Sequence, residues 1–173
     1  SLGAIGIAAP GPLNPRTGVI LNTPNIPAWD NFPIIEKLNA YFHVPVFLGN
    51  DANLAALGEW RYGAGQGHDH LLYLTISTGV GGGIISDRHL LEGKDGLAAE
   101  LGHVTILAEG PICGCGHRGH LEALSSGTAI ARYVKEELKN EKTESSLRSR
   151  ANRSAKSIAK AAREGDPLAL SAY

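Results

Sequence analysis

The chain has 173 residues, 43% of them hydrophobic and 19% charged, which is typical of a globular α/β protein that can bury a core. Its formal net charge of -1 excludes a chain-wide electrostatic surface for nucleic acid or for a membrane. No apolar run approaches the roughly 20 residues of a membrane-spanning helix and no signal-peptide pattern opens the chain, so we expect a cytoplasmic protein.

Short apolar runs alternate along the chain with longer segments of helical periodicity. The runs predict strands at residues 3–8, 44–48, 71–76 and 82–86. The periodic segments predict helices at residues 33–41, 52–62, 122–139 and 154–164, with another helix beginning at Pro167. This alternation indicates an α/β fold, and the Gly-rich residues 63–70 are the candidate linker between two lobes.

The C-terminal part of the chain is more basic than the rest, since it contains ten Lys or Arg residues and six Asp or Glu residues from Arg132 onward. One interpretation is a basic patch for RNA, and the other is a set of solvated surfaces on exposed helices. Aromatic residues are nearly absent from this part, whereas single-strand binders rely on aromatic stacking. We therefore favour solvated helices.

The only two cysteines of the chain, Cys113 and Cys115, lie in the stretch CGCGHRGH, which ends at His120. A disulfide across one intervening residue would be cramped, whereas thiolates and imidazoles are the ligands that zinc prefers. Glycines in the stretch let the loop fold around an ion. We expect zinc to be bound by these three side chains and His103, with His117 as a competitor for either histidine position. An unligated cysteine pair on a turn is the alternative.

The stretch TISTGVGGGI runs from a predicted strand into Thr78 and Gly79, with Gly81, Gly82 and Gly83 after them. Uncovered backbone N–H groups beside a hydroxyl suit the binding of a phosphate. The spacing matches neither the Walker loop nor the dinucleotide-binding fingerprint, so a Gly-rich hairpin without a ligand is the alternative.

Asp51 stands in the stretch FLGNDANLAALGEW, where a predicted strand passes into a predicted helix, and Asn50 and Asn53 flank it. Proteins of the α/β class place reacting groups at the C-terminal ends of strands, so this carboxylate is the candidate general base of a phosphoryl transfer. The alternative role for Asp51 is to cap the following helix.

Six stretches resemble, in their order and spacing, the ROK family of sugar kinases and sugar-responsive repressors: APGPLNPRTG, NTPNIPAW, GNDAN, TISTGVGGG, GLAAELGH and GPICGCGHRGHLEALSSGTAIA. The likeness covers nearly the whole chain and is closest to the bacterial and archaeal glucokinase branch. It implies the actin-like, ribonuclease H-like ATPase fold, in which the active site lies between two lobes. Residues 1–67 would then be the remainder of the N-terminal lobe, and residues 68–173 part of the C-terminal lobe.

The same resemblance implies roles for single residues. Asp51 is similar to the family's general base. The positions similar to its sugar contacts are Asn50, Glu100, His103 and Glu122. The positions similar to its second phosphate-binding loop are Thr78, Gly79, Gly81 and Gly82. His103 would bind zinc through one ring nitrogen and the sugar through the other.

The sequence also departs from the family pattern. His120 stands where the family usually has the third cysteine beside Cys113 and Cys115, which would give two thiolates and two imidazoles, still a good zinc site. Ser77 and Ala99 stand where glycine is usual. The family's first phosphate-binding motif and its C-terminal adenosine contact are absent, and the chain contains no Met. We interpret the chain as a fragment that should be inactive by itself.

These features favour an ATP-dependent sugar kinase of carbohydrate metabolism and glycolysis, most specifically a glucokinase acting on the 6-hydroxyl of glucose, with Mg²⁺ bridging the phosphates of ATP. The expected partners are small molecules, with neither nucleic acid nor a membrane, and the family implies a homo-oligomer, either a dimer or a tetramer. A sugar-responsive transcriptional repressor is the first alternative. A zinc-stabilised sugar-binding module without catalysis is the second.

Overall fold

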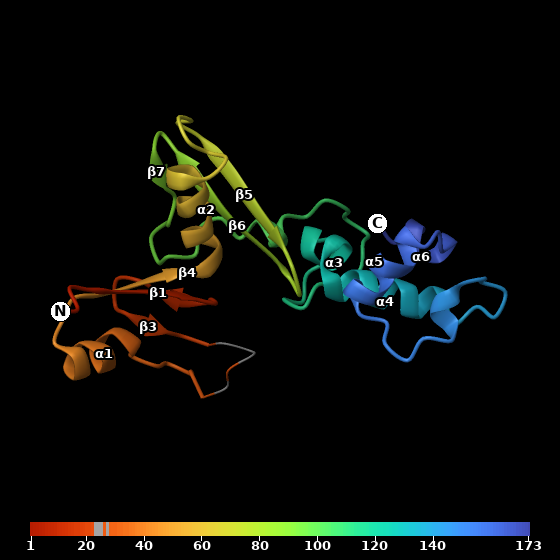
Figure 1. Ribbon diagram of the computed structural model, residues 1–173, viewed down its shortest axis with the longest axis horizontal. Coiled ribbons are helices and arrows are strands. Elements are labelled where there is room, and N and C mark those ends of the chain that lie inside the picture. Colours follow the sequence, from red (N-terminus) through yellow and green to blue (C-terminus); the bar gives the residue numbers. More distant parts are fainter. Residues whose placement is uncertain (23–25, 27) are drawn as a thin grey trace. The chain divides into compact units, whose positions relative to one another are not determined.

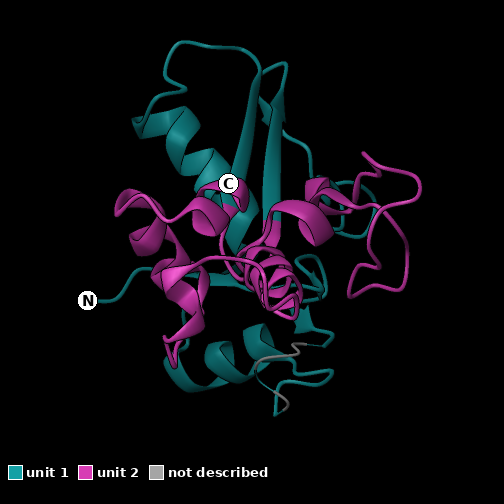
Figure 2. Ribbon diagram, turned by 90° about the vertical axis from the view of Figure 1, so that its right-hand side faces the viewer, with its two compact units in different colours: residues 1–75, 81–100 teal, residues 76–80, 101–173 magenta. Residues whose placement is uncertain are grey.

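A computed structural model describes residues 1–22, 26 and 28–173 of the chain. The described chain divides into two compact units, which are treated separately (Figure 2). Unit 1 holds Ser1–Thr75 and Gly81–Glu100, and unit 2 holds Ile76–Val80 and Leu101–Tyr173. In the stretch NTPNIPAW, residues 23–25 and 27 lie outside the described residues. No helix in the described part is long and apolar enough to cross a membrane.

Unit 1 opens with β1 (Ile5–Ala9), which pairs in parallel with β4 (Val46–Asn50) (Figure 1). Both strands confirm predictions, each lying one or two residues further along the chain than expected. Between them, the described residues form β2 (Leu13–Asn14), β3 (Val19–Ile20) and α1 (Ile34–Phe42). Their apolar side chains form one buried cluster with those of the parallel pair: Ala9, Leu13, Ile20, Ile34 and Leu48.

The helix α2 (Asp51–Tyr62) begins directly after β4 because Asn50 caps it. The Asn50 Oδ1 atom accepts hydrogen bonds from the N–H groups of Ala52 at 3.0 Å and Asn53 at 3.1 Å. These are two of the N–H groups that a helix leaves without a partner inside itself. The predicted helix at residues 52–62 is therefore confirmed, with one residue added at its start.

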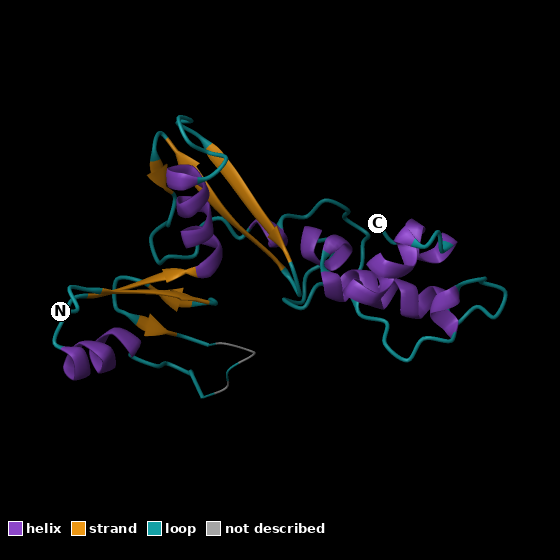
Figure 3. Cartoon of the chain, in the orientation of Figure 1, coloured by secondary structure: helices purple, strands orange, loops and turns teal. Residues whose placement is uncertain are grey.

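A second sheet of unit 1 contains β5 (Leu71–Ile76), β6 (Val80–Ser86) and β7 (His89–Leu90) in that order (Figure 3). Its first two strands confirm the predictions at residues 71–76 and 82–86. β6 approaches α2 so closely that a Cβ atom on Gly83 would lie 2.5 Å from the Ala56 Cβ. Carbon atoms that are not bonded normally stand at least about 3.5 Å apart, so only glycine fits there.

The Gly-rich residues 63–70, predicted as a linker between lobes, connect α2 to β5 inside unit 1. The indole N–H of Trp60 donates to the His68 carbonyl at 2.7 Å and fastens this connection to α2. The compact units therefore divide the chain elsewhere, and the expected lobes at residues 1–67 and 68–173 stay a prediction about the longer protein.

Unit 2 is mainly helical. Its elements are η1 (Leu101–His103), α3 (Leu121–Ser125), α4 (Gly127–Glu137), η2 (Ser146–Arg148), α5 (Ala155–Arg163) and α6 (Pro167–Ser171). The prediction of one helix at residues 122–139 was wrong. Ser126 ends α3 in an extended conformation, and its hydroxyl accepts a hydrogen bond from the Ala129 N–H at the start of α4. The other helices of the unit confirm the predictions at residues 154–164 and after Pro167.

The core of unit 2 joins α4, α5 and α6 through buried apolar side chains: Ile130, Val134, Leu138, Leu147, Ile158, Ala161, Leu168 and Ala169. Beside this core lies Asp166, which is 6% exposed. Its carboxylate accepts hydrogen bonds from the Ala169 N–H at 2.9 Å, the Ser146 N–H at 2.6 Å and the Ser145 hydroxyl at 3.0 Å. Burial alone would raise the pKa of Asp166, but these hydrogen bonds outweigh it and lower the pKa.

We expect Asp166→Ala to lower the free energy of unfolding by about 2 to 4 kcal/mol at pH 7, because a helix cap and hydrogen bonds to a buried charge are lost together. The pKa of Asp166 is lowered in the folded state, so its contribution is complete above the unfolded pKa and is lost as the pH falls through the folded value. Urea unfolding at pH 7 and near pH 3 measures both effects. Asp95→Ala, which removes an exposed carboxylate, is the control; equal losses for the two variants would contradict the prediction.

Candidate functional site

Four potential metal ligands meet in unit 2. His103 ends η1, Cys113 and Cys115 lie in the following loop, and His120 is the residue directly before α3. One ligand atom from each of the four lies within 4.8 Å of the other three. The sequence thus predicted the meeting of residues that stand up to 17 positions apart (120 − 103 = 17).

Two distances within this cluster are close to those between the ligands of a tetrahedral zinc ion. The Cys113 Sγ and His103 Nδ1 atoms are 3.6 Å apart, and the Cys115 Sγ and His120 Nδ1 atoms are 3.2 Å apart. Zn–S bonds of about 2.3 Å and Zn–N bonds of about 2.0 to 2.1 Å place tetrahedral ligands about 3.3 to 3.8 Å from one another. Two thiols and two imidazoles also form a common zinc donor set. The residues present therefore fit this metal.

Backbone contacts hold the loop that carries the cysteines. The Cys113 N–H donates to the His117 carbonyl at 2.7 Å, and the Gly116 N–H donates to the Cys113 carbonyl at 2.9 Å. At Gly119 the φ angle is +69°, and a Cβ atom would lie 1.5 Å from the Leu107 carbonyl oxygen. Glycine is thus required at Gly119 both for its backbone conformation and for space.

The two thiols differ in their proton affinity. Burial raises the pKa of Cys113. Hydrogen bonds with the backbone and the side chain of His117 lower the pKa of Cys115 to about 6, so this thiol is mainly thiolate at neutral pH. Thiolate is the form that binds metals, and zinc binding would displace the remaining proton from Cys113.

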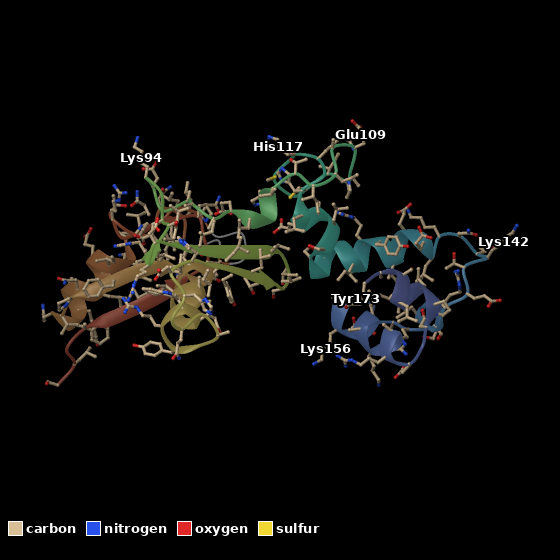
Figure 4. The ribbon with its side chains drawn as sticks, turned by 90° about the horizontal axis from the view of Figure 1, so that it is seen from above. Lys94, Glu109, His117, Lys142, Lys156 and Tyr173 are labelled. Carbon is tan, nitrogen blue, oxygen red and sulfur yellow. The ribbon has the colours of Figure 1, made fainter. Side chains whose placement is uncertain are left out.

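His117 was predicted as a competitor for either histidine position of the zinc site. Its Nδ1 atom is 3.8 Å from the Cys115 Sγ, and its ring stacks on that of His120 with the centroids 5.6 Å apart. His117 is exposed, whereas His120 is 7% exposed and belongs to the group of four. The geometry thus favours His120. Figure 4 labels His117 on the loop, together with Glu109.

Glu122 connects the cluster to the tip of the β5–β6 hairpin. Its Oε1 atom accepts from the Cys113 thiol at 3.5 Å, and its Oε2 atom accepts from the Val80 N–H at 3.0 Å. One carboxylate therefore contacts both a candidate metal ligand and the first residue of β6.

The hairpin tip itself is held by the start of α4. The Gly127 N–H donates to the Ser77 carbonyl at 2.8 Å, and the Thr128 hydroxyl donates to the Thr78 carbonyl at 2.9 Å. Among the described residues, the N–H groups of Thr78 and Gly79 have no hydrogen-bond acceptor. Thr128 was not predicted as a site residue, although the sequence SSGT before a helical pattern signals the helix start that places it.

A cavity of about 340 Å³ adjoins this tip. It is lined by Thr78, by the first residues of α4 and by Ser154, Ala155 and Lys156 at the start of α5. Two helix N-termini, a hydroxyl and an ammonium group thus surround one space, which suits an anion.

The glycines that follow the hairpin tip lie in a strand, unlike Gly79 in the tip itself. Gly81 and Gly82 lie within β6 rather than in a loop. A Cβ atom on Gly81 would stand 3.2 Å from the Ala52 Cβ, so this glycine brings β6 close to α2.

In unit 1, Asp51 is the exposed first residue of α2. Its Oδ1 atom accepts from the Ala52 N–H at 2.8 Å, but the capping residue is Asn50. The alternative that Asp51 is the helix cap is therefore wrong. Because the Asn50 Oδ1 atom is used for capping, the amide nitrogen of Asn50 is the part of that side chain suited to a ligand.

Glu100 is exposed at the end of unit 1, directly after Ala99. The φ angle of Ala99 is +63°, a conformation that glycine adopts more easily. This explains physically why a glycine would be usual at that position. The predicted site residues therefore fall into two groups, with Asn50, Asp51, Gly81, Gly82 and Glu100 in unit 1 and the others in unit 2.

The ROK family model matches residues 1–173. A glucokinase of Thermotoga maritima is 46% identical over 171 residues, covering 96% of this chain and 53% of the relative. A xylose repressor of Bacillus subtilis is 38% identical over 130 residues, covering 75% of this chain and 33% of the relative. The chain spans about half the length of the curated glucokinases it matches.

Solved structures give the same two kinds of relative. One is a ROK family glucokinase from Streptomyces griseus in complex with glucose and AMPPNP, with a TM-score of 0.81 and 40% sequence identity. The match covers 99% of this chain and 57% of the glucokinase chain. Another is a ROK family transcriptional regulator, a homologue of the E. coli MLC protein, with a TM-score of 0.86 and 33% sequence identity. The match covers 98% of this chain and 42% of the regulator chain. The expected actin-like α/β fold is thus confirmed.

Proposed function

Because the chain belongs to the ROK family, we propose that the protein containing it is an ATP-dependent sugar kinase, specifically a glucokinase that phosphorylates the 6-hydroxyl of glucose. The observation that carries this proposal is Asp51, an exposed carboxylate at the C-terminal end of β4 whose helix is capped by another residue. The proposed compartment is the cytoplasm, and a homo-oligomer stays a prediction.

In the proposed reaction, the Asp51 carboxylate accepts the proton of the sugar hydroxyl as its oxygen attacks the γ-phosphorus of ATP. The new bond joins the sugar oxygen to phosphorus, and the bond from phosphorus to the bridging oxygen breaks, with ADP as the leaving group. The first turn of α2 holds Asp51 in place through the cap at Asn50.

The proposed phosphate-binding group is the hairpin tip at Thr78 and Gly79. Its support is the pair of N–H groups without an acceptor among the described residues and the adjoining cavity, which Lys156 also lines. Mg²⁺ bound to ATP would neutralise charge on the phosphates. Since Gly81 and Gly82 lie in β6, we propose that Gly81 acts by letting β6 approach α2 and that neither glycine touches phosphate.

We further propose that zinc orients His103 toward the sugar. The Nδ1 atom of His103 faces the Cys113 sulfur, so Nε2 points to the opposite side of the ring, where it suits a sugar hydroxyl. Glu122 is fixed by the same loop, and Asn50 and Glu100 are the other proposed sugar contacts.

The proposal is tested by a coupled assay of glucose 6-phosphate formation with the full-length protein, ATP and Mg²⁺. We expect turnover with glucose and compare mannose, N-acetylmannosamine and xylose. No phosphorylation of any of these sugars, in protein shown to bind ATP and glucose by calorimetry, would reject the kinase.

The second candidate is a sugar-responsive repressor, which the xylose repressor of Bacillus subtilis and the structurally similar transcriptional regulator favour. The full-length sequence separates the two, since a DNA-binding segment before this chain favours the repressor, and a phosphate-binding turn there favours the kinase. Gel-shift assays with DNA upstream of the gene, with and without sugar, provide the functional test.

A further inference from the structure

The hairpin tip between β5 and β6 is attached to unit 2 from two sides. On one side, residues at the start of α4 donate hydrogen bonds to the carbonyl groups of Ser77 and Thr78. On the other side, the Glu122 Oε2 atom, in the first turn of α3, accepts from the Val80 N–H at 3.0 Å. The proposed phosphate-binding N–H groups, those of Thr78 and Gly79, stand in the sequence between these attachments.

The space beside Gly79 is taken by the Glu122 carboxylate. A Cβ atom on Gly79 would overlap with the Glu122 Oε2 atom and would lie 3.3 Å from its Cδ. Apart from the two chain neighbours of Gly79, no other described atom lies within 4 Å of that position. The φ angle of Gly79 is outside the left-handed region, so the backbone conformation does not require glycine. Glycine is therefore needed there to admit Glu122.

The same carboxylate is also bound to the loop that carries the cysteines. Its Oε1 atom accepts from the Cys113 thiol at 3.5 Å, while Oε2 is used by Val80. A carboxylate offers about four lone-pair positions, so these two hydrogen bonds leave room for a sugar hydroxyl as well. Glu122 can thus serve the hairpin tip whether or not it contacts sugar.

We infer that Glu122 is a positioning residue for the phosphate-binding tip: it fixes the first residue of β6 and thereby the direction of the N–H groups at Thr78 and Gly79. The inference rests on the proposed function only in taking this tip as a phosphate loop. Because the cysteine loop holds the other carboxylate oxygen, the order of that loop should influence nucleotide affinity even when no sugar is bound.

The first test measures binding of AMPPNP with Mg²⁺ to the full-length protein by calorimetry, without sugar. We expect Glu122→Ala to weaken this binding by about three- to tenfold, because the tip then adopts its binding arrangement for a smaller fraction of the time. Glu122→Gln should stay within about twofold of the unmodified protein, since its amide oxygen still accepts from the Val80 N–H. A residue that contacts sugar alone would change neither affinity.

The second test needs no ligand. Hydrogen exchange of residues 76–82, followed by mass spectrometry, should be faster in Glu122→Ala, because the Val80 N–H loses its acceptor, and unchanged in Glu122→Gln. The control for both tests is Glu109→Ala, which removes a carboxylate from an exposed position of the segment between η1 and α3 (Figure 4). We expect this control to behave as the unmodified protein.

Gly79→Ala tests the steric part of the inference. The added methyl group should push the Glu122 carboxylate away from Val80, so the variant should show the faster exchange of Glu122→Ala. The two substitutions disrupt the same hydrogen bond, so the double variant should exchange no faster than Glu122→Ala alone. Additive effects would contradict this pairing. If Glu122→Ala fails to fold by circular dichroism, Gly79→Ala takes its place in both tests.

Equal exchange of residues 76–82 in the Glu122→Ala and Glu109→Ala variants would overturn the inference. In an active glucokinase, equal AMPPNP affinities of these two variants would reject the inference and leave the proposed function standing. Faster exchange in Glu122→Ala, in a protein that binds neither AMPPNP nor ATP, would instead support the positioning of the tip by Glu122 and reject the proposed kinase.

Discussion

Asp51→Asn in the full-length protein is expected to lower kcat for glucose phosphorylation by about 10²-fold or more, the usual scale for loss of a general base. The amide has the shape of the carboxylate and still forms hydrogen bonds, but it cannot accept the proton of the sugar hydroxyl. The KM for glucose should change little, because the interaction lost is one made in the transition state. Steady-state kinetics with a coupled assay measure both values.

The fold should survive this substitution, because Asn50 and not Asp51 caps α2. Glu59→Gln is the control, since it removes a carboxylate from the last turn of the same helix. Asn50→Ala tests the capping of α2 separately from catalysis: it should lower the free energy of unfolding by about 1 kcal/mol through loss of the cap. Turnover of Asp51→Asn close to that of the Glu59→Gln variant would show that Asp51 is not the base.

Protein purified without added metal and without a His tag is expected to contain one zinc per chain. Cys113→Ser should lose the metal, because a structural zinc site depends on each of its four ligands and Cys113 is the buried thiol of the set. Mass spectrometry of the metal content is the measurement. Less than about a tenth of an equivalent in the unmodified protein would rule out the zinc site.

The histidines provide an internal control for the zinc prediction. His120→Ala should lose zinc, whereas His117→Ala should retain it, because His120 belongs to the group of four and His117 is exposed. The opposite result would assign the fourth ligand to His117. The two substitutions remove the same side chain within three residues of the same loop, which makes them a matched pair.

Zinc removal should also weaken glucose binding. If zinc fixes His103 and the loop that holds Glu122, its loss loosens several polar contacts, each worth about 1 kcal/mol, or about 1.5 to 3 kcal/mol where a charge takes part. Calorimetric titration of glucose before and after chelation, in conditions where circular dichroism shows an intact fold, measures the effect. Equal affinities would mean that the metal holds a loop that plays no part in sugar recognition.

Much of the fold could be predicted from the sequence, because its strands and most helices are continuous periodic segments. The break at Ser126 was missed because the apolar helical pattern continues across it and outweighs the helix-start signal SSGT. In the structure, the Ser126 hydroxyl accepts from the Ala129 N–H and so caps a second helix. The paired strands β2 and β3 were missed because a strand of two residues is too short to show an alternation of apolar and polar side chains. They depend on contacts made after the chain folds.

The cysteine–histidine cluster was predictable because its ligand types are rare and close in sequence. The contacts of Glu122 with Val80 and Cys113 were not, since they join residues that stand 42 and 9 positions apart through one side chain. Nor did the sequence show that Asn50 caps α2 while Asp51 does not, because either residue type can cap a helix.

The close packing of Gly83 against Ala56 changes how mutations in the Gly-rich stretch should be interpreted. Alanine at Gly83 would push β6 away from α2, the helix whose first residue is Asp51. Such a variant would lose turnover while its affinity for nucleotide stayed normal, as if Asp51, the proposed general base, had itself been altered. A scan of this stretch would then divide into tip positions that change nucleotide affinity and strand positions that change turnover, within a single run of glycines.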